Sequence, residues 1–120
     1  VVGIVRARDA YRCVVCGRGC HGERGWDWSI QHRQARGSGG CRLEYINQPA
    51  NLVLVCGSGT TECHGRIESE RTWAETCGYI VRRPLIPSHE PVQLHDGSYV
   101  YLTDEGHYSD IEECFEVPHE

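Results

Sequence analysis

Two pairs of cysteines constrain this chain more than any other feature. Cys13 and Cys16 are separated by two residues, and Cys56 and Cys63, about forty residues further on, are separated by six. Two cysteines on one tight turn supply half of the tetrahedral shell of a structural zinc ion, and the other half must come from a distant segment. We therefore predict that these four cysteines bind one structural Zn²⁺, with Cys20 as the alternative fourth ligand.

A chain of this size needs such a cross-link. Its 120 residues make one domain, or one domain with a tail, and only 39% of them are hydrophobic. The N-terminus does not resemble a signal peptide, and no stretch approaches the roughly 20 apolar residues of a membrane span. We expect a cytoplasmic, reducing location, where paired cysteines bind metals more often than they form disulfides. The eight cysteines leave a secreted framework of four disulfides as the alternative.

Charge divides the chain into two unequal parts. Residues 1–83 carry all twelve arginines and eight acidic residues, a net charge of +4. Residues 84–120 carry nine acidic residues and no arginine or lysine, a net charge of −9. Arginine suits bidentate contacts with phosphate, although a GC-rich coding bias would give the same preference over lysine. We predict a core at 1–83 that can approach nucleic acid, and an extension at 84–120 that ends in an acidic, weakly ordered tail.

Apolar periodicity predicts a small α+β fold. Residues 4–12 indicate a short helix, and residues 26–33 alternate in the manner of a half-buried strand. The side chains expected to face the core are Ile4, Val5 and Tyr11 in the helix and Trp26, Trp28 and Ile30 in the strand.

The second half of the core continues the pattern after a long loop. Residues 51–56 indicate a buried strand, and residues 62–78 indicate a helix that stops at Gly78. Further on, Asp96-Gly97 between two alternating runs predicts a β-hairpin at about 92–102.

A second set of polar residues, His32, Asn51 and His64, accompanies the cysteines. Hydrolysis of a phosphodiester bond needs a base that activates water and an electrophile that stabilises the leaving oxygen. Histidine is the natural base near neutral pH. Taken singly, a histidine at a helix start caps or packs, and an asparagine before a strand is a turn residue. Their order within the cysteine frame favours a metal-dependent nuclease.

Three runs of sequence, RCVVCG, SIQHRQARGSGG and NQPANLVLVCGSGTTECHGRIE, resemble the HNH endonucleases in the form common in actinobacteria and their phages. The resemblance covers roughly residues 6–83. It implies a ββα-metal fold, in which two strands and a helix grip one divalent ion (Mg²⁺, Mn²⁺, Ni²⁺ or Zn²⁺), beside a four-cysteine zinc site. It also implies that His32 is the general base, that Asn51 keeps His32 oriented, and that His64 ligates the catalytic metal.

The same resemblance implies DNA as the partner, with the helix in the minor groove. By analogy it suggests a phage setting beside DNA-packaging proteins. From their positions we expect Arg33, Arg36 and Arg66 to lie near phosphates, with solvated surface charges as the alternative.

Gln31 departs from the family pattern, which places an Asp or His metal ligand directly before the base. An amide oxygen is a weak ligand for ions that prefer carboxylates or imidazole. Gln31 can still ligate and give a weaker site, or water or a DNA phosphate can fill the position, with His21 as a further substitute. The remaining interpretation is a catalytically weakened, zinc-stabilised DNA-binding or assembly module.

Overall fold

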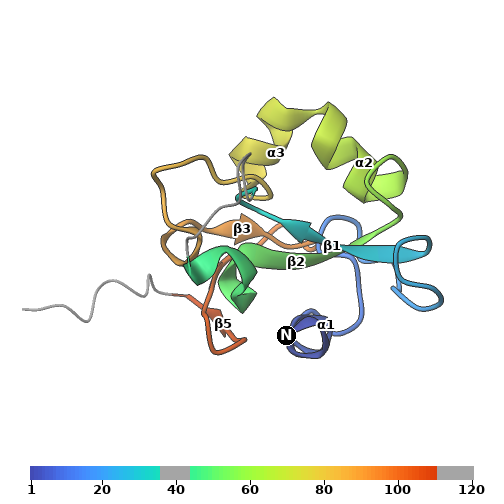
Figure 1. The fold of residues 1–120 in the computed structure, drawn as a ribbon, viewed down its shortest axis with the longest axis horizontal. Helices are drawn as coiled ribbons and strands as arrows, with labels where there is room; N and C mark the ends of the chain where they lie inside the picture. The colour runs from blue at the N-terminus through green and yellow to red at the C-terminus, as the bar shows by residue number, and fades with distance from the viewer. Residues whose placement is uncertain (36–43, 111–120) are drawn as a thin grey trace, which may run out of the picture.

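The structure, a computed structural model, describes residues 1–35 and 44–110. Within them, three α-helices accompany two small antiparallel sheets (Figure 1). The helices are α1 (Val2–Arg8), α2 (Glu62–Ser69) and α3 (Arg71–Cys77). One sheet pairs β1 (Trp28–His32) with β2 (Leu52–Cys56), and the other has the order β3 (Val92–Gln93), β4 (Tyr99–Leu102), β5 (Tyr108–Ser109). Short 3₁₀ helices lie at Glu44–Asn47, Pro49–Asn51 and Pro87–His89. The predicted small α+β class is confirmed.

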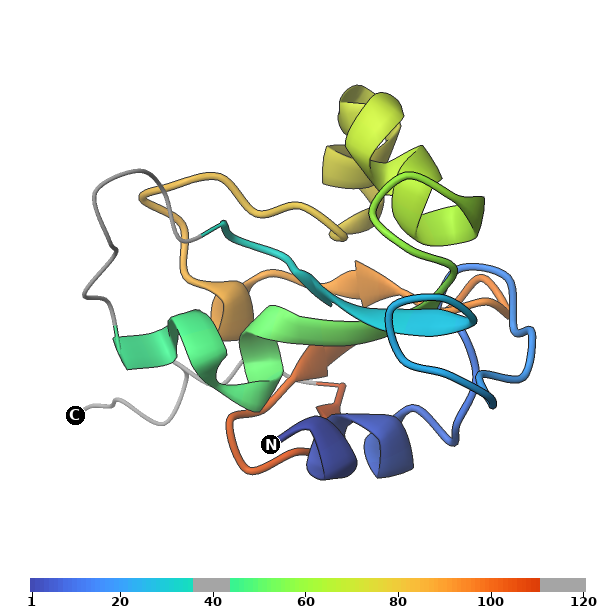
Figure 2. The same cartoon turned by 45° about the vertical axis from the view of Figure 1, so that its right-hand side comes forward.

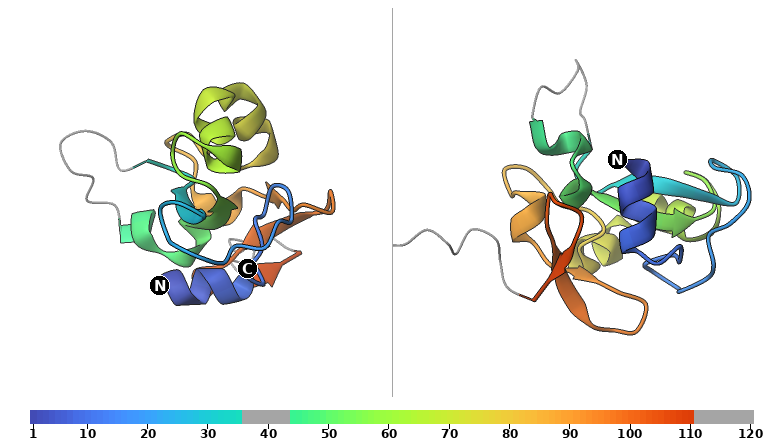
Figure 3. Two further views of the ribbon diagram at one scale, coloured as in Figure 1. Left: turned by 90° about the vertical axis from the view of Figure 1, so that its right-hand side faces the viewer. Right: turned by 90° about the horizontal axis from the view of Figure 1, so that it is seen from below.

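The β1–β2 pair lies between two layers of helix. Figures 1, 2 and 3 show α2 and α3 on one side of it and α1 on the other. All five residues of β2 are buried, because the strand is covered on both sides and its sequence, LVLVC, is apolar throughout. The register sets Trp28 opposite Cys56 and His32 opposite Leu52. The sheet therefore has a cysteine end and a histidine end.

Three of the predicted core positions in the first 30 residues are wrong. The helix ends at Arg8, because Ala10 and Tyr11 both have a φ of 58°, outside the helical region. Val5 is buried as expected, but Ile4 and Tyr11 are exposed. Trp26 was expected beside Trp28 and is instead 76% exposed, because β1 begins only at Trp28.

The predicted helix over 62–78 forms as two helices. Glu70 has φ −117° and ψ 65°, which interrupts the helix between α2 and α3. The change of direction lets Ile67 in α2 and Ala74 in α3 both reach the core. Gly78 ends α3 in the left-handed conformation with φ 87°, as predicted.

The β-hairpin predicted at about 92–102 is confirmed. Val92 pairs with Val100 and Gln93 with Tyr99, and Gly97 takes a φ of 91° in the turn. Val92 and Leu102 belong to the same core cluster as the residues of β2. The boundary at 83/84 stays a prediction, and the acidic tail beyond residue 110 lies outside the described residues.

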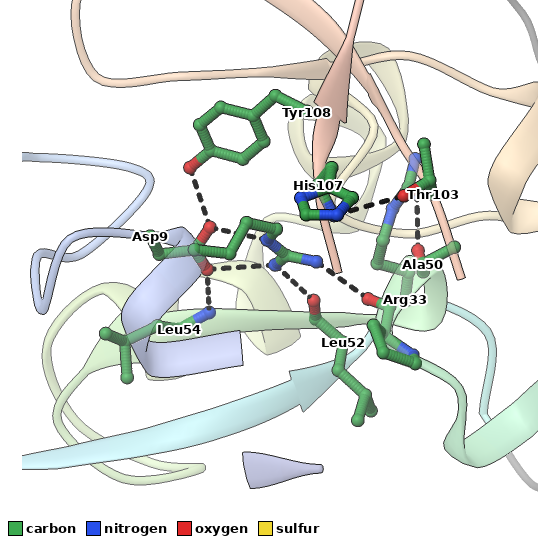
Figure 4. Close-up of polar contacts among 10 residues, drawn as sticks. Asp9, Arg33, Ala50, Leu52, Leu54, Thr103, His107 and Tyr108 are labelled. Carbon is green, nitrogen blue, oxygen red and sulfur yellow. Dashed lines mark hydrogen bonds and ion pairs between the residues drawn. The ribbon is translucent and has the colours of Figure 1, made fainter. Parts of the chain in front are cut away.

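A buried carboxylate ties the extension to the N-terminus (Figure 4). Asp9 is 5% exposed, and its two oxygens accept hydrogen bonds from the Arg8 guanidinium at 2.9 and 3.0 Å. It also accepts from the Leu54 amide at 3.0 Å and the Tyr108 hydroxyl at 2.7 Å. One side chain thus joins α1, β2 and β5.

Candidate functional site

The two cysteine pairs come together at one end of the β1–β2 sheet. The Sγ atoms of Cys13, Cys16, Cys56 and Cys63 all lie within 4.8 Å of one another, and this group could hold a metal ion. Gly17 makes the first turn possible, because it adopts a φ of 79°. Cys20 is buried beside the cluster without belonging to it, and its Sγ lies 3.7 Å from the Arg18 carbonyl.

The pKa values of these thiols show that ionising all four together is unfavourable unless a cation is bound. Burial raises the pKa of Cys13 to about 12 and also raises the pKa of Cys63. Burial opposes ionisation of Cys16 as well, but hydrogen bonds from the Arg18 amide and the neighbouring thiols bring its pKa below the usual value. Thiolates packed this closely repel one another unless a cation neutralises them. Four sulfur ligands in this arrangement suit Zn²⁺.

Asn51 is completely buried and binds the chain on either side of the long loop. Its Oδ1 accepts a hydrogen bond from the Gln34 amide at 2.7 Å. Its Nδ2 donates to the carbonyls of Gln34 at 3.0 Å and Ile46 at 2.8 Å. The Asn51 side chain therefore holds the backbone at Gln34, two residues after His32.

A serine on β1 determines which nitrogen of His64 carries a proton. The Ser29 hydroxyl donates to the Gly57 carbonyl at 2.6 Å, and its oxygen lies 2.6 Å from His64 Nδ1. The hydroxyl has one hydrogen, and the carbonyl can only accept it. Nδ1 must therefore be the donor to Ser29, which leaves the lone pair of His64 on Nε2. Burial lowers the pKa of His64, which favours this neutral form.

His32 has the opposite arrangement. Its Nε2 lies 3.1 Å from Asn47 Oδ1, an amide oxygen that can only accept. Nε2 therefore carries the hydrogen, and the lone pair lies on Nδ1. After burial, electrostatic repulsion by His32 makes a smaller contribution to the lowered pKa of His64.

His32 lines an open cleft of about 580 Å³. The charged side chains that share this cleft are Glu68, Arg71, Arg82 and Arg83, together with the buried Arg33. Gln31 also lines it, but this side chain is only 4% exposed. Gln31 Nε2 donates to the His32 carbonyl at 2.9 Å and lies 3.5 Å from the Tyr79 carbonyl. The amide nitrogen of Gln31 is thus occupied by backbone contacts.

The prediction that Arg33 lies near phosphates is wrong. Arg33 is 1% exposed, and its guanidinium donates to backbone carbonyls that include Gly78, Ala50, Pro87 and Glu90 at 2.7 to 2.9 Å. A strand pattern cannot reveal this, because the acceptors come from segments distant in sequence.

The other predicted arginines have different outcomes. Arg36 lies outside the described residues. Arg66 stays on the surface, where it pairs with Glu70 at 3.2 Å and stacks 3.7 Å over the Trp73 ring. The sequence reasoning missed Arg71, Arg82 and Arg83, which line the His32 cleft.

Two further residues clarify what the sequence could have shown. The sequence reasoning also missed Ser29. Side chains alternate along a strand, so Ser29 shares a face with Gln31, and this was a signal that it could lie near the site. His21 was a possible substitute ligand, but it lines a separate recess with Trp26 and Thr61.

Beyond the four cysteines, the described residues contain no other group of three or more His, Cys, Asp or Glu side chains close enough to hold a metal as they stand. A catalytic metal therefore stays a prediction.

Comparison with protein-family models, curated proteins and solved structures finds no significant match to this chain. In the part of the chain that the structure describes, no helix has the length and apolar character to span a membrane.

Proposed function

We propose that this chain is a metal-dependent DNA endonuclease or nickase of the HNH type, with a ββα-metal core made of β1, β2 and α2. The observation that carries the proposal is a pair of histidines with complementary lone pairs. His32 keeps its lone pair on Nδ1 and His64 on Nε2, each determined by a hydrogen bond to the other nitrogen. One acts as a base and the other as a metal ligand, which are the two roles that phosphodiester hydrolysis requires.

In this proposal His32 Nδ1 takes the proton from the attacking water. Asn47 holds Nε2–H, so the ring stays oriented while its charge changes. Asn51 fixes the backbone after His32, and this makes it a positioning residue. His64 Nε2 would hold the divalent ion, whose chemistry is to stabilise charge on the phosphate and the leaving oxygen.

Three arginines around the cleft fit the DNA backbone better than the buried Arg33. Arg71, Arg82 and Arg83 line the cleft that contains His32. The side chains of Arg71 and Arg82 are 52% and 70% exposed. Their exposed ion pairs with glutamates are worth little in water, so phosphate can compete for the guanidinium groups. We propose that these residues hold the strand across His32.

The second candidate function is a zinc-stabilised DNA-binding or assembly module without catalysis. The specific observation that favours it is Gln31, a buried amide whose nitrogen is engaged by backbone oxygens. This alternative predicts DNA binding without cleavage, and it predicts that Gln31→His or Gln31→Asp would switch cleavage on. A Gln31→His variant that binds DNA and stays inert would count against it.

A plasmid assay separates the two functions. Supercoiled DNA is incubated with the zinc-loaded protein in Mg²⁺, Mn²⁺ or Ni²⁺, and the nicked and linear forms are measured. His32→Ala should lower the rate by roughly 10²- to 10⁴-fold, the usual contribution of a general base. His107→Ala, at an exposed histidine, is the matched control and should leave it unchanged. Absence of nicking by the wild type, or equal nicking by His32→Ala, would refute the nuclease.

A further inference from the structure

Glu68 is the one carboxylate that lines the His32 cleft among the described residues, and none of the site predictions includes it. We propose that Glu68 supplies the hard oxygen ligand that position 31 lacks, so that Glu68 and His64 together bind a Mg²⁺ or Mn²⁺ ion from one face of α2. The catalytic meaning of this site rests on the proposed nuclease function, but the ion-binding itself can be measured without it.

The helix places the two side chains together. Glu68 follows His64 by four residues within α2, and residues at this spacing are neighbours, with Cβ atoms roughly 5–6 Å apart. Ile67, on the side of the helix next to His64 and away from Glu68, is completely buried and packs α2 against the core.

The imidazole of His64 and the carboxylate of Glu68 each keep an atom that can bind an ion. Ser29 occupies Nδ1 of His64, and among the described residues Nε2 has no hydrogen-bond partner. Glu68 Oε1 lies 3.2 Å from Arg71 Nη1, which steadies the carboxylate and leaves Oε2 for a ligand. The Glu68 side chain is 45% exposed, so an ion can reach it from solvent.

The chemistry of the ion favours this carboxylate over Gln31. Mg²⁺ and Mn²⁺ prefer charged oxygen ligands and keep several waters, so two protein ligands plus water and a phosphate oxygen complete a shell. Gln31 offers a neutral amide and is buried against Tyr79. A ligand on the helix can therefore replace the ligand missing from the strand.

The test is a Mn²⁺ titration followed by the electron paramagnetic resonance signal of the free ion. It uses the zinc-loaded chain of 120 residues without DNA. The wild type should bind one Mn²⁺, and Glu68→Gln should weaken binding by at least about 10-fold, the low end of the range for perturbed metal sites. His64→Ala should do the same. Glu70→Gln is the matched control, since Glu70 is a neighbouring carboxylate paired with Arg66, and it should bind as the wild type does.

Circular dichroism and zinc content verify that each variant is folded, and Glu68→Gln preserves the shape of the side chain. If Mn²⁺ binds equally to Glu68→Gln and the wild type, or to neither, the Glu68 site is overturned. The contact of Glu68 with Arg71 is then a surface ion pair only. Nicking by the wild type that persists in Glu68→Gln would overturn it too, while leaving the nuclease proposal standing. Mn²⁺ binding that depends on Glu68, without any nicking, would support the Glu68 site and refute the proposed nuclease function.

Discussion

Replacing Arg33 with methionine should unfold this protein more easily rather than weaken its contact with DNA. The guanidinium makes four hydrogen bonds of 2.7 to 2.9 Å, to the carbonyls of Gly78, Ala50, Pro87 and Glu90. These carbonyls belong to the end of α3, the 3₁₀ helix before β2 and the segment that leads into β3. Arg33 thus holds three separate segments around the end of β1.

The size of the effect follows from these bonds. Methionine fills a similar volume but removes the guanidinium donor from four carbonyls. The Pro87 carbonyl keeps another donor, the Glu90 amide at 3.2 Å, and each unreplaced bond costs about 1–3 kcal/mol. Removing the buried charge returns part of this cost, because the guanidinium no longer has to be desolvated. We expect Arg33→Met to lower the free energy of unfolding by about 3–5 kcal/mol, a large part of the roughly 5–15 kcal/mol available to a domain. Arg33→Lys should not restore it, because one ammonium group cannot reach all four acceptors.

The assay is urea unfolding of the zinc-loaded protein, followed by circular dichroism. With a slope of about 1–3 kcal/mol per molar urea, the midpoint for Arg33→Met should fall by more than 1 M. Arg24→Met is the control, because Arg24 is exposed, and it should shift the free energy by less than about 0.5 kcal/mol. An Arg33→Met variant as stable as the wild type but weakened in DNA binding would refute this reasoning and restore Arg33 as a phosphate contact.

Three further perturbations have defined outcomes. Ser29→Ala should release His64 Nδ1, reduce nicking by about 10- to 100-fold and change the tautomer seen in ¹⁵N NMR, whereas the exposed Ser98→Ala should do neither. We expect the four-cysteine cluster to bind a structural zinc ion, which would contribute about 10–16 kcal/mol, so a chelator under reducing conditions should abolish the folded circular dichroism spectrum; a chain that stays folded would contradict this. Burial raises the pKa of Tyr79, so above about pH 10 only the unfolded chain ionises there and stability falls as the pH rises. Tyr79→Phe should remove that part of the pH dependence. It should also cost about 1 kcal/mol at neutral pH, since the hydroxyl donates to the Gln93 carbonyl at 2.8 Å. If urea unfolding of the variant shows the same fall of unfolding free energy above about pH 10 as the wild type, Tyr79 is excluded as the cause.

Short-range patterns were sufficient wherever one or two neighbouring residues dictate the backbone. Gly78 and Gly97 adopt φ values of 87° and 91°, which side chains with a Cβ rarely accept, and each ends or turns its segment as predicted. The cysteine spacing worked for a related reason. A C-x2-C turn forms locally, and a distant pair at the end of a strand and the start of a helix can meet it once the strand is paired.

Patterns failed where the deciding partner is remote. Alternation placed Trp26 inward, but the strand begins two residues later and the Trp26 side chain is left mostly exposed. Helical composition over 62–78 could not reveal the break at Glu70, which is set by the need of two short helices to cover one sheet. The unusual burial of Arg33 depends on carbonyls that are 17 to 57 residues away.

By itself, the sequence determined which residues could do chemistry here: four thiols spaced for one cation, two histidines and an asparagine in a fixed order, and an amide where a ligand was expected. Only the tertiary structure decided their chemical states. The proton positions of His32 and His64 are set by Asn47 and Ser29, which lie 15 and 35 residues from them. Hydrogen bonds of this kind act over about 3 Å in space and are independent of distance along the chain, so no local pattern encodes them.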